Sequence, residues 1–259
     1  MKQKLSIIKI GGNIIEDQDY LSQFLKLFAQ LEGRKILVHG GGKRATDLGK
    51  RLGIESKMVE GRRITDAKSL ELVVMVYAGL VNKKIVAQLQ ANNSNAIGLS
   101  GADANTVIAV KRPVNKLDFG FVGDIVDVNA GSISVLLNAE FVPVFCALTH
   151  DTNGQLFNTN ADTIASEVAI AMSQAYDTTL YYCFEKKGVL RSVTDEDSVI
   201  QKINRENYQK LKQDKIVADG MLPKLDNCFH ALNKEVQRVC IGDITMFEPE
   251  AQLFTTKTL

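Results

Sequence analysis

The segment KILVHGGGKRATDLG, residues 35–49, decides how the rest of the sequence is interpreted. An apolar run at residues 36–38 leads into three glycines, and a helix-compatible segment follows them. A glycine turn between a strand and a helix exposes backbone N–H groups, and these groups bind anions. The segment therefore predicts an anion site at the end of a strand, and leaves open which anion it binds.

Two nucleotide-binding motifs can be compared with these glycines. Gly40, Gly42 and Ala45 satisfy the dinucleotide-binding pattern G-x-G-x-x-G/A, and Glu55 or Glu60 stands at a tolerable distance for a ribose contact. The P-loop pattern fits worse, because an arginine stands where a magnesium-binding Ser or Thr is needed. A NAD(P)-dependent oxidoreductase of the Rossmann type is therefore one candidate.

Apolar strand-like runs alternate with helix-like segments over most of the 259 residues. This alternation predicts an α/β fold with a mainly parallel sheet that is covered on both faces, in two lobes that share the sheet. A long helix over residues 66–92 carries an apolar stripe wide enough for core packing and a subunit interface. Residues 112–123 contain a proline and two glycines, which predicts a hairpin or flap. The strand-like runs are residues 5–10, 35–38, 96–99, 106–110, 125–128, 141–145 and 179–184.

Composition limits the classes of function. The chain carries 31 Lys and Arg against 30 Asp and Glu and has no long basic run, which argues against nucleic acid or a membrane surface as a partner. The 4 cysteines are scattered, without a C-x-x-C pair or a His at ligand spacing, so we expect neither a zinc site nor disulfides. No stretch is apolar for about 18 residues. We expect a cytoplasmic protein that binds small molecules.

Another glycine turn follows the first strand-like run. Lys9 lies near the end of this run, directly before Gly11 and Gly12, so its ammonium group is expected beside accessible N–H groups. The carboxyl ends of parallel strands meet at one edge of a sheet, where ligands bind. Two glycine turns at this edge predict two anionic groups, or one anion held from both sides. Taken alone, a lysine at a strand end is more often simply solvated.

Further polar residues fit a substrate that carries carboxylates. Arg63 precedes the long helix, and an arginine fork suits a carboxylate. Asn158, Asn160 and Asp162 alternate, so an extended backbone would place all three on one side, and Asp162 can cap the helix that follows. Lys224 follows a glycine and a proline that shape the backbone before it. Each of these residues also has an ordinary explanation as a surface or loop residue.

Together these residues favour phosphoryl transfer. We find no nucleophile motif of the G-x-S-x-G kind, whereas lysines and backbone amides supply the positive charge that phosphoryl transfer requires. A carboxylate suits this inventory best as the acceptor, because it is ionised at neutral pH and needs no general base.

Six motifs extend this pattern along the chain: IIKIGG, VHGGG, GRRIT, DFGFVGDI, LFNTNAD and DGMLPK, in this order. As an ordered set they resemble the bacterial N-acetylglutamate kinases of the amino acid kinase family over nearly the whole chain. The resemblance implies a three-layer αβα fold. It also implies ATP-dependent phosphorylation of the side-chain carboxylate of N-acetyl-L-glutamate, the second step of arginine biosynthesis.

The resemblance implies a role for each site residue. Lys9 and Lys224 would neutralise charge on the phosphoryl group in flight, and Asp162 would fix the positions of both lysines. Gly12 and Gly41 would donate backbone N–H groups to the phosphoryl oxygens. The implied substrate-binding residues are Gly41, Gly42, Arg63, Asn158 and Asn160. The implied ATP-binding residues are Glu185, Gly188, Leu190, Val217 and Ala218.

Two lobes would divide these tasks. Residues 1–176 would bind the acylglutamate and form a homodimer, partly through the long helix, and residues 177–259 would bind ATP. Mg²⁺ would enter on the phosphates of ATP with little direct ligation by the protein. Members of the family that arginine inhibits carry a helix before the first strand, and since only four residues precede Leu5 we expect no arginine feedback.

The sequence also departs from the family pattern. A Glu-Lys-Lys-Gly-Val stretch at residues 185–189 replaces the usual Asp-Val-x-Gly-Val, which affects the expected adenine contacts. Lys111, Arg112 and Lys116 border the flap, so N-succinylglutamate is an alternative substrate with an additional carboxylate.

Overall fold

The computed structural model describes residues 2–59, 62–192, 194–214, 216–217, 221–248, 251 and 254–257, without the side chains of residues 222–224. The chain forms two compact units, one made of Met1–Ile36 with Ala165–Leu259 and the other of Leu37–Ile164. The first strand pairs with a strand near residue 180, which places the start of the chain in the same unit as its last third. The assignment of acylglutamate binding to residues 1–176 and of ATP binding to residues 177–259 stays a prediction.

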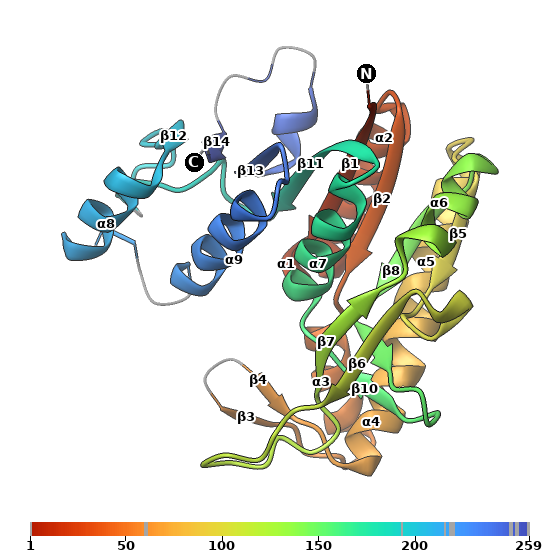
Figure 1. The fold of residues 1–259 in the computed structure, drawn as a ribbon. Coiled ribbons are helices and arrows are strands. Elements are labelled where there is room, and N and C mark those ends of the chain that lie inside the picture. Colours follow the sequence, from red (N-terminus) through yellow and green to blue (C-terminus); the bar gives the residue numbers. More distant parts are fainter. Residues whose placement is uncertain are drawn as a thin grey trace. The chain divides into compact units, whose positions relative to one another are not determined.

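The first unit is built on a mixed set of strands, of which three are parallel neighbours. Strand order is β12-β14-β13-β11-β1, in which β1, β11 and β13 run parallel while β14 and β12 run opposite to β13. Ile7, Ile8 and Ile10 of β1 are fully buried, as expected for a strand of a covered parallel sheet. Its elements, most of α7 included, are β1 (Gln3–Ile10), α1 (Gly12–Glu16), α2 (Gln18–Gln30), α7 (Ala161–Ser173), β11 (Tyr176–Cys183), β12 (Lys202–Ile203), α8 (Arg205–Gln213), α9 (Leu222–Asn233), β13 (Arg238–Gly242), η3 (Ile244–Phe247) and β14 (Thr255–Lys257) (Figure 1).

The second unit holds three groups of strands. The order β2-β8-β5 is parallel, the order β10-β9-β6-β7 is mixed, and β3 and β4 form an antiparallel pair. The mainly parallel α/β fold predicted from the sequence is confirmed. The elements of the second unit are β2 (Arg34–His39), α3 (Gly42–Arg51), β3 (Lys57–Val59), β4 (Arg62–Ile64), α4 (Ala67–Val74), η1 (Met75–Val81), α5 (Asn82–Ala91), β5 (Ala96–Leu99), η2 (Asp103–Asn105), β6 (Val107–Lys111), β7 (Gly123–Val128), α6 (Ala130–Asn138), β8 (Val142–Cys146), β9 (Leu148–His150) and β10 (Leu156–Asn158).

The long helix predicted over residues 66–92 is present as α4, η1 and α5. Asp66 caps its start, because the carboxylate accepts a hydrogen bond from Ser69 N at 2.8 Å. The middle segment η1 is a π-helix, which the apolar periodicity did not predict. Such segments are rare and frequently occur at functional sites.

The predicted hairpin at residues 112–123 joins β6 to β7 and continues past the sheet as a long loop (Figure 1). Its return segment is hydrogen-bonded to Thr65, which donates from N to Phe119 O at 2.9 Å and accepts at O from Phe121 N at 2.7 Å. Gly120 lies between these contacts with φ +71°, and a Cβ atom there would clash with Thr65 O. This glycine is therefore required by both conformation and space.

Within the described part of the chain, no helix combines the length and the apolar composition that a membrane span needs. All four cysteines are buried as free thiols. Burial raises the pKa of Cys146 and of Cys240 to about 12, so these thiols are protonated at neutral pH.

Candidate active site

The glycine turn after β2 is tightly packed. Gly41 is buried at the N-terminus of α3, and a Cβ atom on Gly41 would lie 2.8 Å from Cδ1 of Tyr77 in the π-helix. A Cβ atom on Gly42 would lie 3.7 Å from the Tyr77 hydroxyl. The ring of Tyr77 therefore covers this turn, and Gly41 leaves the space that the ring fills.

Arg63 fixes a positive charge beside this turn. Its side chain, in a residue only 6% exposed, donates hydrogen bonds to Gly42 O at 2.9 Å, to Thr46 Oγ1 at 2.8 Å and to Ser56 Oγ. Burial raises the pKa of Tyr77, and the charge of Arg63 and its hydrogen bond to the phenol oppose that rise. The guanidinium group is thus held in one position, and its charge favours an anion beside the glycine turn.

Asn158 ends β10 and contacts the segment that follows Arg63. Its side-chain amide donates to Thr65 Oγ1 at 3.0 Å, and its backbone N–H donates to Phe121 O at 2.9 Å. The amide therefore lies between the end of β4 and the flap. The structure thus connects the predicted substrate residues Arg63 and Asn158 through Thr65, which sequence reasoning did not select.

Asn160 caps α7, which corrects the prediction for Asp162. The helix begins at Ala161, and Asn160 Oδ1 accepts hydrogen bonds from Asp162 N at 2.6 Å and Thr163 N at 3.4 Å. Asp162 is therefore a buried residue of the first helical turn and not the cap. The backbone is not extended through Asn158, Asn160 and Asp162, because the helix starts between the last two, so the condition for placing all three on one side is not met.

The glycine turn after β1 is open. Gly11 N donates to Cys183 O at 2.9 Å, which ties the turn to the end of β11, and a Cβ atom on Gly12 meets no described heavy atom within 4 Å. Lys9 is partly buried next to this turn. Burial and the charge of Asp243 raise the pKa of Cys183, whereas Lys9 lowers it, so the ammonium charge acts at the carboxyl ends of β1 and β11.

The predicted ATP segment lies in the same unit as Lys9. A Cβ atom on Gly188 would come within 2.7 Å of Thr255 Oγ1, so the loop approaches β14 closely at this glycine. The next residue, Val189, donates from N to the same Thr255 oxygen at 2.9 Å. Glu185 is exposed, and Leu190 forms an isolated β-bridge.

Three further predictions concern residues 217–224. Val217 is described and buried. Ala218 and the side chain of Lys224 lie outside the described residues, so their roles remain predictions.

The predicted site residues are divided between the two units. In the second unit Gly42 is hydrogen-bonded to Arg63 and Gly41 packs against Tyr77, while Asn158, Asn160 and Asp162 follow one another at the junction of β10 and α7. Lys9, Gly12, Glu185, Gly188, Leu190 and Val217 belong to the first unit. Tyr77 was missed because an aromatic residue on an apolar helical stripe has the same pattern as any core residue.

With this geometry, comparison with known proteins assigns the family. The sequence profile of the amino acid kinase family matches residues 4–243, so the chain belongs to the amino acid kinase family. Acetylglutamate kinase from Phocaeicola vulgatus is 56% identical over 241 residues, which cover 93% of this chain and 94% of that protein. Acetylglutamate kinase from Cytophaga hutchinsonii is 56% identical over 240 residues, covering 92% and 91%. The resemblance inferred from the ordered motifs is confirmed, and the Rossmann oxidoreductase alternative is set aside.

Solved structures agree on the fold. The crystal structure of smu.665 from Streptococcus mutans UA159 has a TM-score of 0.79 at 28% identity and covers 98% of both chains. Carbamate kinase from Giardia lamblia bound to AMP-PNP has a TM-score of 0.70 at 12% identity and covers 99% of this chain and 98% of that one. The second likeness carries information on the fold alone.

Proposed function

We propose that this protein transfers the γ-phosphoryl group of ATP to the side-chain carboxylate of N-acetyl-L-glutamate, which forms N-acetyl-L-glutamyl 5-phosphate in arginine biosynthesis. The observation that carries the proposal is the buried Arg63, fixed beside the turn of Gly41 and Gly42, in a chain 56% identical to proteins named acetylglutamate kinase. A buried cation of this kind requires an anionic partner to offset its desolvation.

The substrate would lie along the second unit. Arg63 and Asn158 would bind its α-carboxylate and its amide, Asn160 would hold the start of α7, and Gly42 would line the site. The side-chain carboxylate attacks the γ-phosphorus while the bond to the ADP oxygen breaks. Because that carboxylate is already ionised, proton abstraction is not required and the chemistry depends on position and charge.

Charge on the phosphoryl group would be neutralised from several directions. Lys9 and Lys224 would contribute ammonium groups, Gly12 and Gly41 would donate N–H groups, and Asp162 would orient the lysines. These contacts strengthen as the phosphoryl group leaves ADP, and interactions of this kind accelerate the chemical step.

ATP would bind to the segment that includes Glu185, Gly188, Leu190, Val217 and Ala218. The close approach of Gly188 to β14 supports this assignment, because it holds the loop against the sheet in a fixed place. Mg²⁺ would accompany the ATP phosphates and supply further charge neutralisation. Over the described residues, His, Cys, Asp and Glu side chains do not form a group of three or more that could hold a metal ion.

Charges at the flap favour acetyl over succinyl as the acyl group. Arg112 donates from Nε and Nη2 to Asp124 Oδ1 at 2.9 and 2.6 Å. Lys111 Nζ lies 3.6 Å from Asp118. Two of the three cations that border the flap, Lys111 and Arg112, thus already have carboxylate partners, which a second substrate carboxylate would have to displace.

The test is a coupled trapping assay. ATP-Mg is offered with N-acetylglutamate, N-succinylglutamate, glutamate or aspartate in parallel, and acyl phosphate is captured with hydroxylamine. We expect hydroxamate from N-acetylglutamate at the highest kcat/KM. Absence of hydroxamate from both acylated substrates contradicts the proposed reaction.

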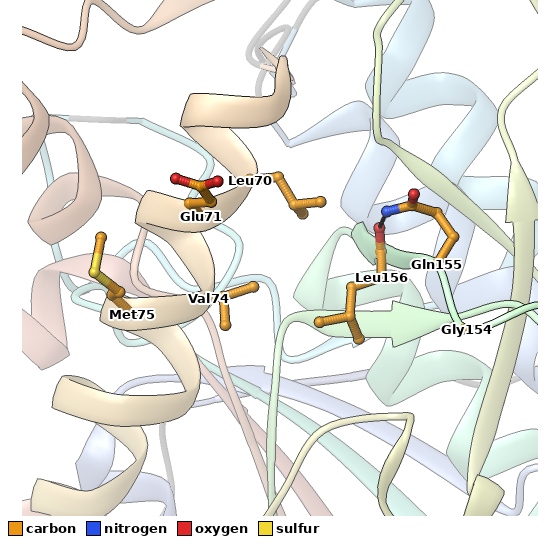
Figure 2. A pocket seen from close by; sticks show the side chains of 7 residues that line it. All are labelled: Leu70, Glu71, Val74, Met75, Gly154, Gln155 and Leu156. Carbon is orange, nitrogen blue, oxygen red and sulfur yellow. Dashed lines mark hydrogen bonds between the residues drawn. The ribbon is translucent and has the colours of Figure 1, made fainter.

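The protein would act as a homodimer formed partly through α4, η1 and α5. Met75 and Leu80 of this helix are 54% and 41% exposed. A pocket of about 500 Å³ adjoins Met75, where Leu70 and Val74 of α4 face Leu156 (Figure 2). Burying such apolar surface against a second copy is favourable.

Light scattering tests the dimer. We expect about 57 kDa for the wild type, twice the 28.5 kDa chain. The variant Met75→Glu, Leu80→Glu should run as a monomer, whereas Val135→Glu on the exposed face of α6 should not change the mass. A monomeric wild type contradicts this assignment.

A further inference from the structure

A network of buried polar groups lies beneath the second glycine turn. His39 is fully buried at the end of β2, and Asn82 is 1% exposed at the start of α5. Nδ1 of His39 lies 2.7 Å from Gly40 O, and its Nε2 lies 3.0 Å from Nδ2 of Asn82. A histidine next to a glycine turn resembles a general base, so the protonation of its two nitrogens decides its role.

The contacts of Asn82 determine which way its amide group faces. Its Nδ2 donates to Val144 O at 2.9 Å, and its Oδ1 accepts from the Lys83 ammonium group at 3.2 Å. The NH2 group therefore also faces His39, and because it can only donate, Nε2 of His39 accepts and carries no proton. Gly40 O can only accept, so Nδ1 carries the proton and donates it. A neutral ring protonated at Nδ1 satisfies every contact.

The bond to Gly40 O fixes the orientation of one peptide plane. Gly40 O and Gly41 N–H belong to the same trans peptide and point in opposite directions. Since His39 holds the oxygen towards the buried ring, the Gly41 N–H points away from it. Glycines on both sides of this peptide restrict its rotation little, so a side-chain hydrogen bond is an effective restraint.

We propose that His39 is a positioning residue, which holds the peptide between Gly40 and Gly41 with its N–H directed towards the phosphoryl group. The inference rests on the proposed function, in which that N–H donates to a phosphoryl oxygen. Both ring nitrogens are engaged by protein groups, which leaves neither to abstract a proton. Burial, with a contribution from the Lys83 charge, lowers the pKa of His39 to about 4, so the ring is neutral at physiological pH.

Two substitutions separate positioning from packing. The amide nitrogen of asparagine is as many bonds from the backbone as Nδ1, so His39→Asn keeps a donor for Gly40 O. The amide nitrogen of glutamine is one bond farther, so His39→Gln loses that donor. We expect kcat of His39→Gln to fall at least about tenfold with the KM for N-acetylglutamate changed less than about threefold, and His39→Asn to keep at least roughly a third of the wild-type kcat.

A spectroscopic readout complements the kinetics. Long-range proton–nitrogen spectra of the ¹⁵N-labelled wild type should show a neutral His39 protonated at Nδ1 at pH 7. The control Ile133→Val, which removes a buried methyl group from α6, should lower thermal stability and leave kcat unchanged. Equal losses of kcat in both His39 variants, or a ring protonated at Nε2, would overturn the proposal. A wild type that forms no hydroxamate overturns the proposed function instead, whereas the spectra do not depend on turnover.

Discussion

The two glycine turns have the same sequence pattern, a buried strand followed by glycines and a helix, yet they are built differently. The turn at Gly12 is open, and the turn at Gly41 is filled by the ring of Tyr77. The first is tied by a backbone hydrogen bond from Gly11 to the neighbouring strand, and the second by the side chains of Arg63 and His39. Glycine thus leaves open space in the turn at Gly12 and permits close packing in the turn at Gly41. Substitutions in the two turns should therefore have different effects on activity and on stability.

The largest effect is expected at the open turn. Lys9→Met removes the ammonium group while keeping the length of the side chain, so kcat should fall about 10²–10³-fold with little change in substrate KM. Steady-state hydroxamate kinetics measure both constants. Lys4→Met, at an exposed position of the same strand, is the matched control and should behave as the wild type. A change confined to KM would show that Lys9 binds substrate in the ground state only.

The packed turn should make stability depend on pH. The pKa of His39 is lowered from 6.5 to about 4. Between these two pH values the unfolded chain binds more protons than the folded chain does. The free energy of unfolding therefore has its full value above about pH 6.5 and falls by about 3 kcal/mol on acidification to about pH 4. Urea unfolding at several pH values measures this slope. The slope should become shallower in His39→Asn, and an unchanged slope there would mean that other groups cause it.

Gly41→Ala tests the packing of the second turn directly. Its methyl group would meet the Tyr77 ring at 2.8 Å, so the ring or the turn must shift, at a cost of about 1–3 kcal/mol in the free energy of unfolding. Activity should fall as well, because the displaced turn carries the proposed N–H donor. Denaturant unfolding with an unaltered midpoint would indicate that the ring moves freely.

Gly12→Ala should have the smallest effect on stability, within about 0.5 kcal/mol, because its methyl group enters open space. The proposed phosphoryl position adjoins that space, so kcat should nevertheless fall about tenfold. Comparing unfolding and turnover for both alanine variants sharpens the contrast between the turns. If Gly12→Ala left kcat unaffected, the space beside Gly12 would not be part of the active site.

Much of the fold was predictable from local pattern. Apolar runs located strands such as Ala96–Leu99 without error, and the long helix with its Asp66 start followed from periodicity. The π-helix did not, since i→i+5 hydrogen bonding is rare and leaves no distinct pattern in the sequence. The helix cap was misplaced because Asn160 and Asp162 both cap well, and local sequence does not choose between them.

The charged residues of the candidate site were predictable from the sequence, whereas the residues that hold the site in place were not. Arg63 was selected for its chemistry, and the structure shows it buried beside the glycine turn. The positioning contact of His39 is not visible in the sequence, because its partner Asn82 lies 43 positions farther along the chain. Tyr77 was counted as an ordinary apolar position. Such partners are defined by tertiary contact, and a single sequence contains no record of it.

The π-helix has a further consequence for how the site tolerates changes in chain length. In a regular α-helix, residues 77 and 82 would lie about 140° apart around the axis. In η1 the backbone N–H of Asn82 instead reaches Tyr77 O, so both side chains face the turn that they support. Deleting one residue between them would make them i and i+4 neighbours in an ordinary α-helix, about 40° apart, so both side chains should still face the turn. The π-helix thus accommodates one additional residue without turning Asn82 away from His39.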